Sequence, residues 1–177
     1  MYILFGVLGV LIFFVVMALV MKKQYVISSE VIIKRSQADV FNYIIHLKNQ
    51  EIYSKWVMMD PNVKLTYTGI DGTVGFKAAW SSAMRDVGVG EQEITKIIPG
   101  QGYYVELRFE KPFKAINYAN TMVTAISENE SKVVTTFNAK TPFPMNLMVP
   151  MITKMLKKDM ETNGANLKKN LEMNSMA

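Results

Sequence analysis

The N-terminal part of the chain is an uninterrupted apolar run, residues 3–21, with no charged and no strongly polar side chain. At a helical rise of 1.5 Å per residue it would be about 28 Å long, close to the hydrocarbon thickness of a bilayer. A soluble surface helix of this length would need a polar face. The run therefore predicts a transmembrane helix, and a fully buried soluble helix is the alternative.

A cleavable secretory signal is a second alternative for the same run. Such a signal has a basic segment before its apolar core and a small-x-small cleavage site after it. Only the terminal amine precedes the run and no Ala-x-Ala follows it, so we predict an uncleaved, single-pass anchor. Lys22 and Lys23 come directly after it. Since basic residues beside a span stay on the cytoplasmic side, we expect the C-terminal domain to be cytoplasmic.

The chain beyond the anchor is basic and contains no cysteine. All charged residues follow position 21, so the formal net charge of +5 belongs to this part. A basic domain would be attracted to an anionic leaflet by up to about 1 kcal/mol for each well-placed Lys or Arg. Nucleic-acid binding is the other explanation of a basic balance. We do not expect it, because the sequence has no Arg-rich run and no recognition motif.

Hydrophobic periodicity predicts the order of the elements that follow. Residues 24–35 alternate apolar and polar side chains, as a half-buried strand does. Ser36, with Asp39 three residues on, resembles a capping box and predicts a helix start, and a second short helix is expected at about 50–58. Six further stretches separated by short turns predict an antiparallel meander. These stretches are residues 62–69, 74–81, 87–98, 103–112, 116–127 and 132–140.

The last expected element is a long amphipathic helix at about residues 145–171. Two prolines in residues 141–144 end the sheet, and Pro150 suits a first helical turn. A seven-stranded antiparallel sheet wrapped around this helix would bury the apolar faces, which makes the domain α+β and leaves a cavity between helix and sheet. The predicted divisions are a transmembrane anchor at 1–23, one domain at 24–172 and a tail at 173–177.

The residues of common catalytic and metal sites are missing from the sequence. A single histidine, His46, and the lack of cysteine exclude most Cys/His metal sites and thiol catalysis. His46 is expected to be a surface or capping residue near a helix C-terminus. Gly88-x-Gly90 lacks the third glycine of a phosphate loop and predicts a bulge or close packing instead. We assign no catalytic residue and expect no metal or cofactor.

Several carboxylates fall within the predicted strands. Glu106 and Arg108 alternate with apolar residues, so we expect them on the outer face as cross-strand pairs. Each such pair would stabilise the sheet by about 0.3 kcal/mol. A carboxyl that pointed inward would have a raised pKa and could act as an acid or a base. Glu91 is the candidate for this, because the two glycines before it could shift the strand register.

The positive signal in the sequence is apolar. Methionine accounts for 14 of the 177 residues, and flexible thioethers suit a surface that adapts to varied apolar partners. Core packing explains any one of the inward residues, but the set as a whole predicts a ligand-binding cavity. Its predicted wall consists of Trp56, Tyr67, Phe76, Trp80, Val105, Leu107, Phe109, Met122, Phe137, Met148, Met151 and Met155.

Six phrases of the sequence carry a resemblance to a known superfamily. They are VIIKRSQADVFNYI at 31–44, the segment from Trp56 to Asp60-Pro61, GTVGFKAAWSS at 72–82, GVGEQEITKIIPG at 88–100, ELRFEKPF at 106–113 and PFPMNLM at 142–148. In this order they resemble the START-like superfamily with the helix-grip (START/Bet v 1-like) fold, and within it the polyketide cyclase/dehydrase and lipid-transport group (SRPBCC). The resemblance covers about residues 24–172 and implies a cavity more firmly than an activity.

Three functions follow from these observations. The leading hypothesis is a membrane-tethered, non-enzymatic domain that binds a lipid or other hydrophobic small molecule, since such a ligand concentrates in the bilayer beside the tether. The second is a polyketide cyclase/dehydratase-like enzyme, which would place an ionisable group in the cavity, with Glu91, Tyr67 or Tyr118 as candidates. The third is a protein-interaction module, which would expose a contiguous apolar patch.

Overall fold

A computed structural model describes residues 2–173 of the chain, with side chains described from Phe5 onward. The helices are α1 (Tyr2–Val20), α2 (Gln37–Ile44), the 3-10 turn η1 (Leu47–Asn49), α3 (Gln50–Tyr53), α4 (Lys55–Met59), the 3-10 turn η2 (Met145–Met148) and α5 (Val149–Met173). The strands are β1 (Gln24–Ile33), β2 (Lys64–Thr68), β3 (Lys77–Ser81), β4 (Val89–Ile98), β5 (Gly102–Lys111), β6 (Ala115–Ser127) and β7 (Glu130–Lys140).

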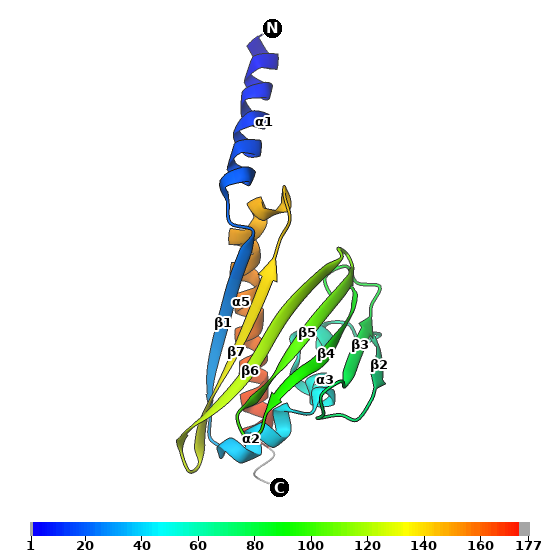
Figure 1. Ribbon diagram of the computed structural model, residues 1–177, viewed down its shortest axis with the longest axis vertical. Helices are drawn as coiled ribbons and strands as arrows, with labels where there is room; N and C mark the ends of the chain where they lie inside the picture. Colours follow the sequence, from blue (N-terminus) through cyan, green and yellow to red (C-terminus); the bar gives the residue numbers. More distant parts are fainter. Residues whose placement is uncertain (1, 174–177) are drawn as a thin grey trace.

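The strands form one antiparallel sheet of seven strands in the order β1-β7-β6-β5-β4-β3-β2. Strands β2 to β7 are a meander, and β1 pairs with β7 at the far edge along its whole length. The sheet curves around α5, while α2, α3 and α4 lie beside the C-terminal half of that helix (Figure 1). The predicted α+β architecture, a seven-stranded antiparallel sheet with a long C-terminal helix, is confirmed.

Local sequence signals explain where several elements begin and end. The Ser36 hydroxyl accepts a hydrogen bond from the Asp39 backbone N–H at 3.1 Å, so the predicted helix cap is confirmed. The single helix expected at 50–58 is instead two helices, because Ser54 has an extended backbone (φ −73°, ψ 117°) between α3 and α4. The predicted bulge is also present, as a register shift between Val89 and Gly90 in the pairing of β4 with β5.

The packed core lies at the end of the domain where α2 meets the sheet and the last turns of α5. Its fully buried side chains come from β1, α2, the β2–β3 loop, β4, β6 and the C-terminal half of α5. They include Ile33, Val40, Ile44, Leu47, Phe76, Ile94 and Val123, with Leu167 and Leu171 from α5. This cluster fixes one end of α5 against the sheet.

Residues 2–20 form the predicted N-terminal helix, which projects from the opposite end of the domain (Figure 1). Asn146 of η2 holds its C-terminal end: the Asn146 amide donates to the Ala18 carbonyl at 2.6 Å and to the Met21 carbonyl at 3.0 Å. Across the part of the chain that is described, no helix has the length and hydropathy needed to cross a membrane. The prediction of a transmembrane span at 3–21 has no support from this finding. Of the predicted tail at 173–177, residues 174–177 lie outside the described residues.

Candidate ligand cavity

A cavity of about 610 Å³ lies between the concave face of the sheet and α5, on the side of the packed core nearest α1. Strands β1 and β3 to β7 form one wall, α3 and α4 close one side, and the middle of α5 covers it. Seven of the residues predicted for a cavity wall lie on it. They are Trp56, Trp80, Val105, Leu107, Phe109, Phe137 and Met155.

The cavity remains open because the inward side chains of β6 are small. Ala119 and Thr121 point into it, between Val105 of β5 and Phe137 of β7. The large apolar side chains of the same strand, Ile116 among them, are exposed on the outer face. Small residues at these inward positions leave space that larger ones would fill. On the opposite wall Gly164 of α5 packs closely on β1, since an added Cβ would lie 3.4 Å from Val31.

Two predicted wall residues lie outside the main cavity. Phe76 is 1% exposed within the packed core, and its ring stacks on Tyr67 at a centroid distance of 6.0 Å. Tyr67 borders a separate small cavity of about 30 Å³, and its hydroxyl donates to Glu51 at 2.5 Å. Burial raises the pKa of Tyr67, and the hydrogen bond to Glu51 adds to the rise. Alternation predicted correctly that both side chains point inward, but the space around them is filled by core side chains.

Three predicted methionines also lie elsewhere. Met122 is on the outer face, because its neighbours Thr121 and Val123 are the inward residues of β6. The sequence pattern was ambiguous there, since apolar residues occur on both faces of this strand. Met148 of η2 and Met151 of α5 are exposed and do not line the cavity. The helical stripe that contains them continues past the end of the cavity.

An aromatic pair forms part of the cavity wall at the end nearest α1. The Trp80 indole packs edge-on against Phe109 at a centroid distance of 5.6 Å, and its N–H donates to the Val87 carbonyl at 3.1 Å. Gly90 makes this packing possible, because a Cβ there would lie 2.7 Å from the Trp80 ring and 2.6 Å from the Arg108 carbonyl oxygen. Close packing at the second glycine of Gly88-x-Gly90 is therefore confirmed.

Polar side chains that the sequence analysis missed line the deeper part of the wall. Gln92 of β4 donates to Gln50 of α3 at 2.7 Å, and the buried tyrosines Tyr53 and Tyr103 lie on the same wall. Burial raises the pKa of both tyrosines. Alternation along β5 could have predicted Tyr103 as a wall residue, because it shares its face with Val105. Gln92 could not be recognised as inward from the sequence pattern, because it lies between two glutamates.

The charged residues of the wall include one buried ion pair. Lys55 of α4 forms an ion pair with the buried Asp159 of α5, and the Lys55 backbone N–H donates to the Asn163 side chain at 2.7 Å. These contacts join α4 to α5. Arg85 and Asp86 of the β3–β4 loop also border the cavity and are exposed to solvent.

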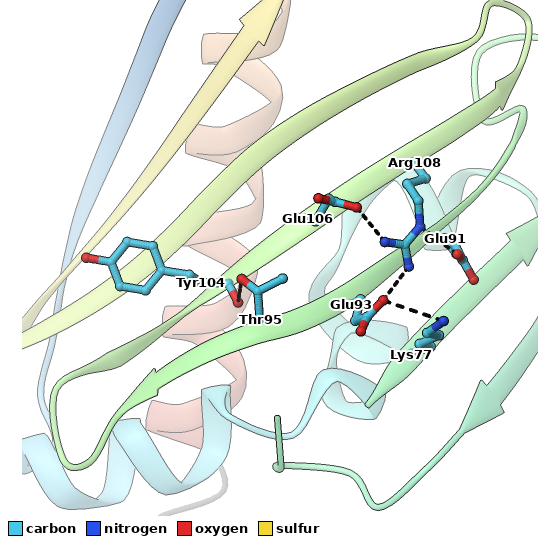
Figure 2. Close-up of polar contacts among 7 residues, drawn as sticks. All are labelled: Lys77, Glu91, Glu93, Thr95, Tyr104, Glu106 and Arg108. Carbon is cyan, nitrogen blue, oxygen red and sulfur yellow. Dashed lines mark hydrogen bonds and ion pairs between the residues drawn. The ribbon is translucent and has the colours of Figure 1, made fainter. Parts of the chain in front are cut away.

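The outer face of the same strands is an ion-pair network. Arg108 contacts three carboxylates, Glu91 at 2.7 Å, Glu93 at 2.5 Å and Glu106 at 2.5 Å (Figure 2). The hydrogen bond from Arg108 is the main cause that lowers the pKa of Glu93, with Lys77 contributing. The prediction that Glu106 and Arg108 point outward is confirmed, and Glu91 lies with them.

The three residues proposed for catalysis are therefore not on the cavity wall. Glu91 pairs with Arg108 on the outer face, Tyr118 is exposed there, and Tyr67 borders the smaller cavity. Among the residues that the structure describes, no group of three or more His, Cys, Asp or Glu side chains could hold a metal ion.

Residues 24–172 match the protein family described as polyketide cyclase/dehydrase and lipid transport. The chain belongs to this family. The resemblance drawn from the six sequence phrases is thus confirmed at the level of the family. No match was found among curated proteins.

Solved structures of similar fold support the same architecture. Norcoclaurine synthase from Thalictrum flavum, in complex with dopamine and hydroxybenzaldehyde, is similar with a TM-score of 0.62 at 14% identity, covering 89% of this chain and 92% of that one. The protein TTHA0849 from Thermus thermophilus has a TM-score of 0.61 at 13% identity, covering 85% and 99%. Ara h 8.0201 has a TM-score of 0.53 at 14% identity, covering 81% and 98%. At these identities the similarity shows a shared fold.

Proposed function

We propose that this protein binds a lipid or other hydrophobic small molecule in the cavity between the sheet and α5. The observation that carries the proposal is the cavity itself, about 610 Å³ of space with a largely apolar wall inside a domain of ordinary size. Empty apolar volume of this kind costs stability, because its lining loses packing contacts. A bound apolar ligand would restore those contacts.

The family supports this proposal, since its description includes lipid transport. A structural neighbour also supports it, because norcoclaurine synthase is described in complex with two small aromatic molecules. The enzymatic alternative has less support. Its candidate acids and bases lie outside the cavity, and Glu91 already pairs with Arg108.

Native mass spectrometry of the full-length protein, released gently from detergent, tests the proposal. We expect an apolar adduct on the protein, which is lost on denaturation. The two tryptophans of the sequence, Trp56 and Trp80, both line the cavity, so intrinsic fluorescence should also respond to added apolar probes. The matched control is Ala119→Phe, which fills the middle of the wall. Absence of any adduct and of any fluorescence response in the wild type would contradict the proposal.

We further propose that α1 tethers this binding domain to a membrane, with the domain in the cytoplasm. The described side chains of α1 are apolar and, apart from the buried Ala18, exposed around the helix, with Phe5 at 62% and Leu19 at 64%. A contiguous apolar surface of this kind is unfavourable in water and favourable in lipid. Lys22 and Lys23 directly after the helix favour the cytoplasmic side for the domain.

The end of the domain that faces α1 also suits a lipid surface. The Thr141 N–H donates to the Lys23 carbonyl at 2.8 Å, so β7 ends beside α1, and antiparallel pairing brings the β5–β6 turn to the same end (Figure 1). Exposed apolar side chains occur there in both segments, namely Phe113, Phe143, Met148 and Met151. Lys111, Lys114 and Lys140 are exposed nearby, and no ion pair joins them to a carboxylate within the described range 5–173.

Membrane fractionation tests the tether. The wild-type protein should sediment with membranes and remain there after carbonate or high-salt washing, whereas Leu8→Glu together with Leu11→Glu should release it. A protease added to intact spheroplasts should spare the domain if it is cytoplasmic. Wild-type protein in the supernatant would disprove the tether, and cleavage in intact spheroplasts would disprove the orientation.

A further inference from the structure

The cavity has a closed end and an open end, and the strand register orders the residues between them. At the closed end the wall meets Ile44, Val133 and Leu167, which are all buried in the core. At the open end it meets Arg85, Asp86 and Met155, which are exposed. A guest molecule would therefore enter beside the β3–β4 loop and the first half of α5, and extend towards the core.

The row of the sheet that follows Val133 towards the opening is polar. Tyr103 of β5 pairs with Thr121 of β6, and Thr121 pairs with Thr135 of β7, with 3.3 Å between the two threonine hydroxyl oxygens. The next row towards the opening is apolar and consists of Val105, Ala119 and Phe137. Further along β5, Leu107 and Phe109 continue the apolar wall.

Helix α3 adds polar groups to the same closed end. Tyr53 is 8% exposed and Tyr103 is 3% exposed, and Gln50 lies on the wall with them. Burial raises the pKa of Tyr103, and hydrogen bonds with Thr121, Gln50 and Tyr53 oppose that rise. The Tyr103 hydroxyl thus lies within a cluster of polar side chains on the cavity wall, where a ligand group that reaches the closed end could bond to it.

Within the described residues, no free charged side chain of the wall is buried at this end, because Glu30, Arg85 and Asp86 are exposed and Lys55 is paired with Asp159. Asp71 adds to burial in raising the pKa of Tyr103, but it does not line the cavity and already accepts hydrogen bonds from the Leu47 and Lys48 backbone N–H groups. An ionised ligand group placed beside Tyr103 would lose its hydration without gaining an opposite charge, which is strongly unfavourable. A neutral group that accepts a hydrogen bond would not incur this cost.

From this arrangement we infer that the closed end of the cavity is a subsite for the uncharged, hydrogen-bonding end of an amphipathic molecule, a hydroxyl or a carbonyl, which binds to Tyr103. The hydrocarbon body lies along Val105, Leu107 and Phe109 towards the opening. This inference rests on the proposed function, because it specifies the orientation and chemical class of the ligand in the same cavity.

A series of ten-carbon probes tests the subsite on the full-length protein in detergent. Decane, 1-decanol, 2-decanone and decanoate share a hydrocarbon body and differ in their end group. Titration with each probe is followed by the fluorescence of Trp56 and Trp80. We expect 1-decanol and 2-decanone to bind about tenfold more tightly than decane, since one buried hydrogen bond is worth roughly that factor. Decanoate should bind no more tightly than decane.

Two variants test whether Tyr103 causes the preference for 1-decanol over decane. Tyr103→Phe removes only the hydroxyl, and it should reduce the affinity for 1-decanol to that for decane while leaving decane unchanged. The matched control is Tyr43→Phe, which removes a hydroxyl that donates to Asn170 and does not line the cavity. Tyr43→Phe should retain the preference. If Tyr103→Phe does not fold, Thr121→Val, which removes the hydroxyl paired across the strands with Tyr103, should weaken the preference instead.

The outcomes separate the subsite from the function on which it rests. Binding of decane and 1-decanol with equal affinity, or tightest binding of decanoate, would overturn the subsite and leave the proposed function standing. An undiminished preference in Tyr103→Phe would also overturn it. No binding of any probe would overturn both.

Discussion

The space between the sheet and α5 is packed near α2 and hollow towards α1, although the same strands and the same helix line both parts. At the α2 end, Phe76, Ile94 and Val123 are at most 2% exposed and fill the space. Towards α1, the inward positions of β6 include the small Ala119, and a cavity of about 610 Å³ remains. The difference is one of side-chain volume on a common backbone. The packed part can supply the stability that the hollow part lacks.

The largest expected effect comes from removing a ring in the packed part. Phe76→Ala should lower the free energy of unfolding by about 3–5 kcal/mol, because the surrounding core cannot close the space. Phe109→Ala, on the cavity wall, should cost only about 1–2 kcal/mol, because the Phe109 ring already borders empty volume. Denaturant unfolding of both variants measures the two losses. Equal losses would mean that the two parts of the interior are packed alike.

Adding side-chain volume should also destabilise the packed part more than the hollow part. Ala78 is 7% exposed within the packed core, so Ala78→Leu should destabilise the domain by about 1–3 kcal/mol through overpacking. Ala119→Leu extends into the cavity and should change stability by less than about 1 kcal/mol. Thermal unfolding of the two variants side by side is the measurement. A loss for Ala119→Leu as large as that for Ala78→Leu would show that the cavity is filled in solution.

A smaller effect is expected on the outer face, which contributes ion pairs and little packing. Arg108→Ala should lower the free energy of unfolding by about 1 kcal/mol at pH 7, because it removes three partly exposed ion pairs and leaves their carboxylates close together. Lys77→Ala, which removes one contact to Glu93 at 3.5 Å, should cost less.

The loss of stability caused by Arg108→Ala should depend on pH. Arg108 lowers the pKa of Glu93 in the folded protein, so its stabilising effect is present above the ordinary glutamate pKa and is lost as pH falls through the lowered value. The stabilities of wild type and Arg108→Ala should therefore converge in acid. A difference that stays constant from neutral pH to acid would exclude this network as its source.

The smallest effect on stability is expected at the end of the domain facing α1. Met151 is 60% exposed, so Met151→Gln should change the free energy of unfolding by less than about 0.5 kcal/mol. It should nevertheless weaken attachment to anionic vesicles if this end rests on lipid. Unchanged attachment together with unchanged stability would limit the membrane contact to α1.

The residues themselves determined the architecture. Alternation from 24 onward, turn sequences and the Ser36 cap predicted seven strands and the helices between them, because period and capping are local properties of the chain. Alternation also gave the correct face for Arg108 and for Leu107. It failed at Met122, since β6 has apolar side chains on both faces and only packing chooses between them.

What the tertiary structure alone decided is where the inward face is filled and where it is empty. The sequence placed Phe76 and Phe109 on the same face and could not tell the core residue from the cavity residue, because that depends on which strand row meets α2 and α3. It likewise could not bring Gln50 and Tyr53 beside Tyr103, more than 45 positions away along the chain. The burial of Tyr103 and its polar neighbours at the closed end arise from packing between distant segments. The chemistry of the cavity depends on both.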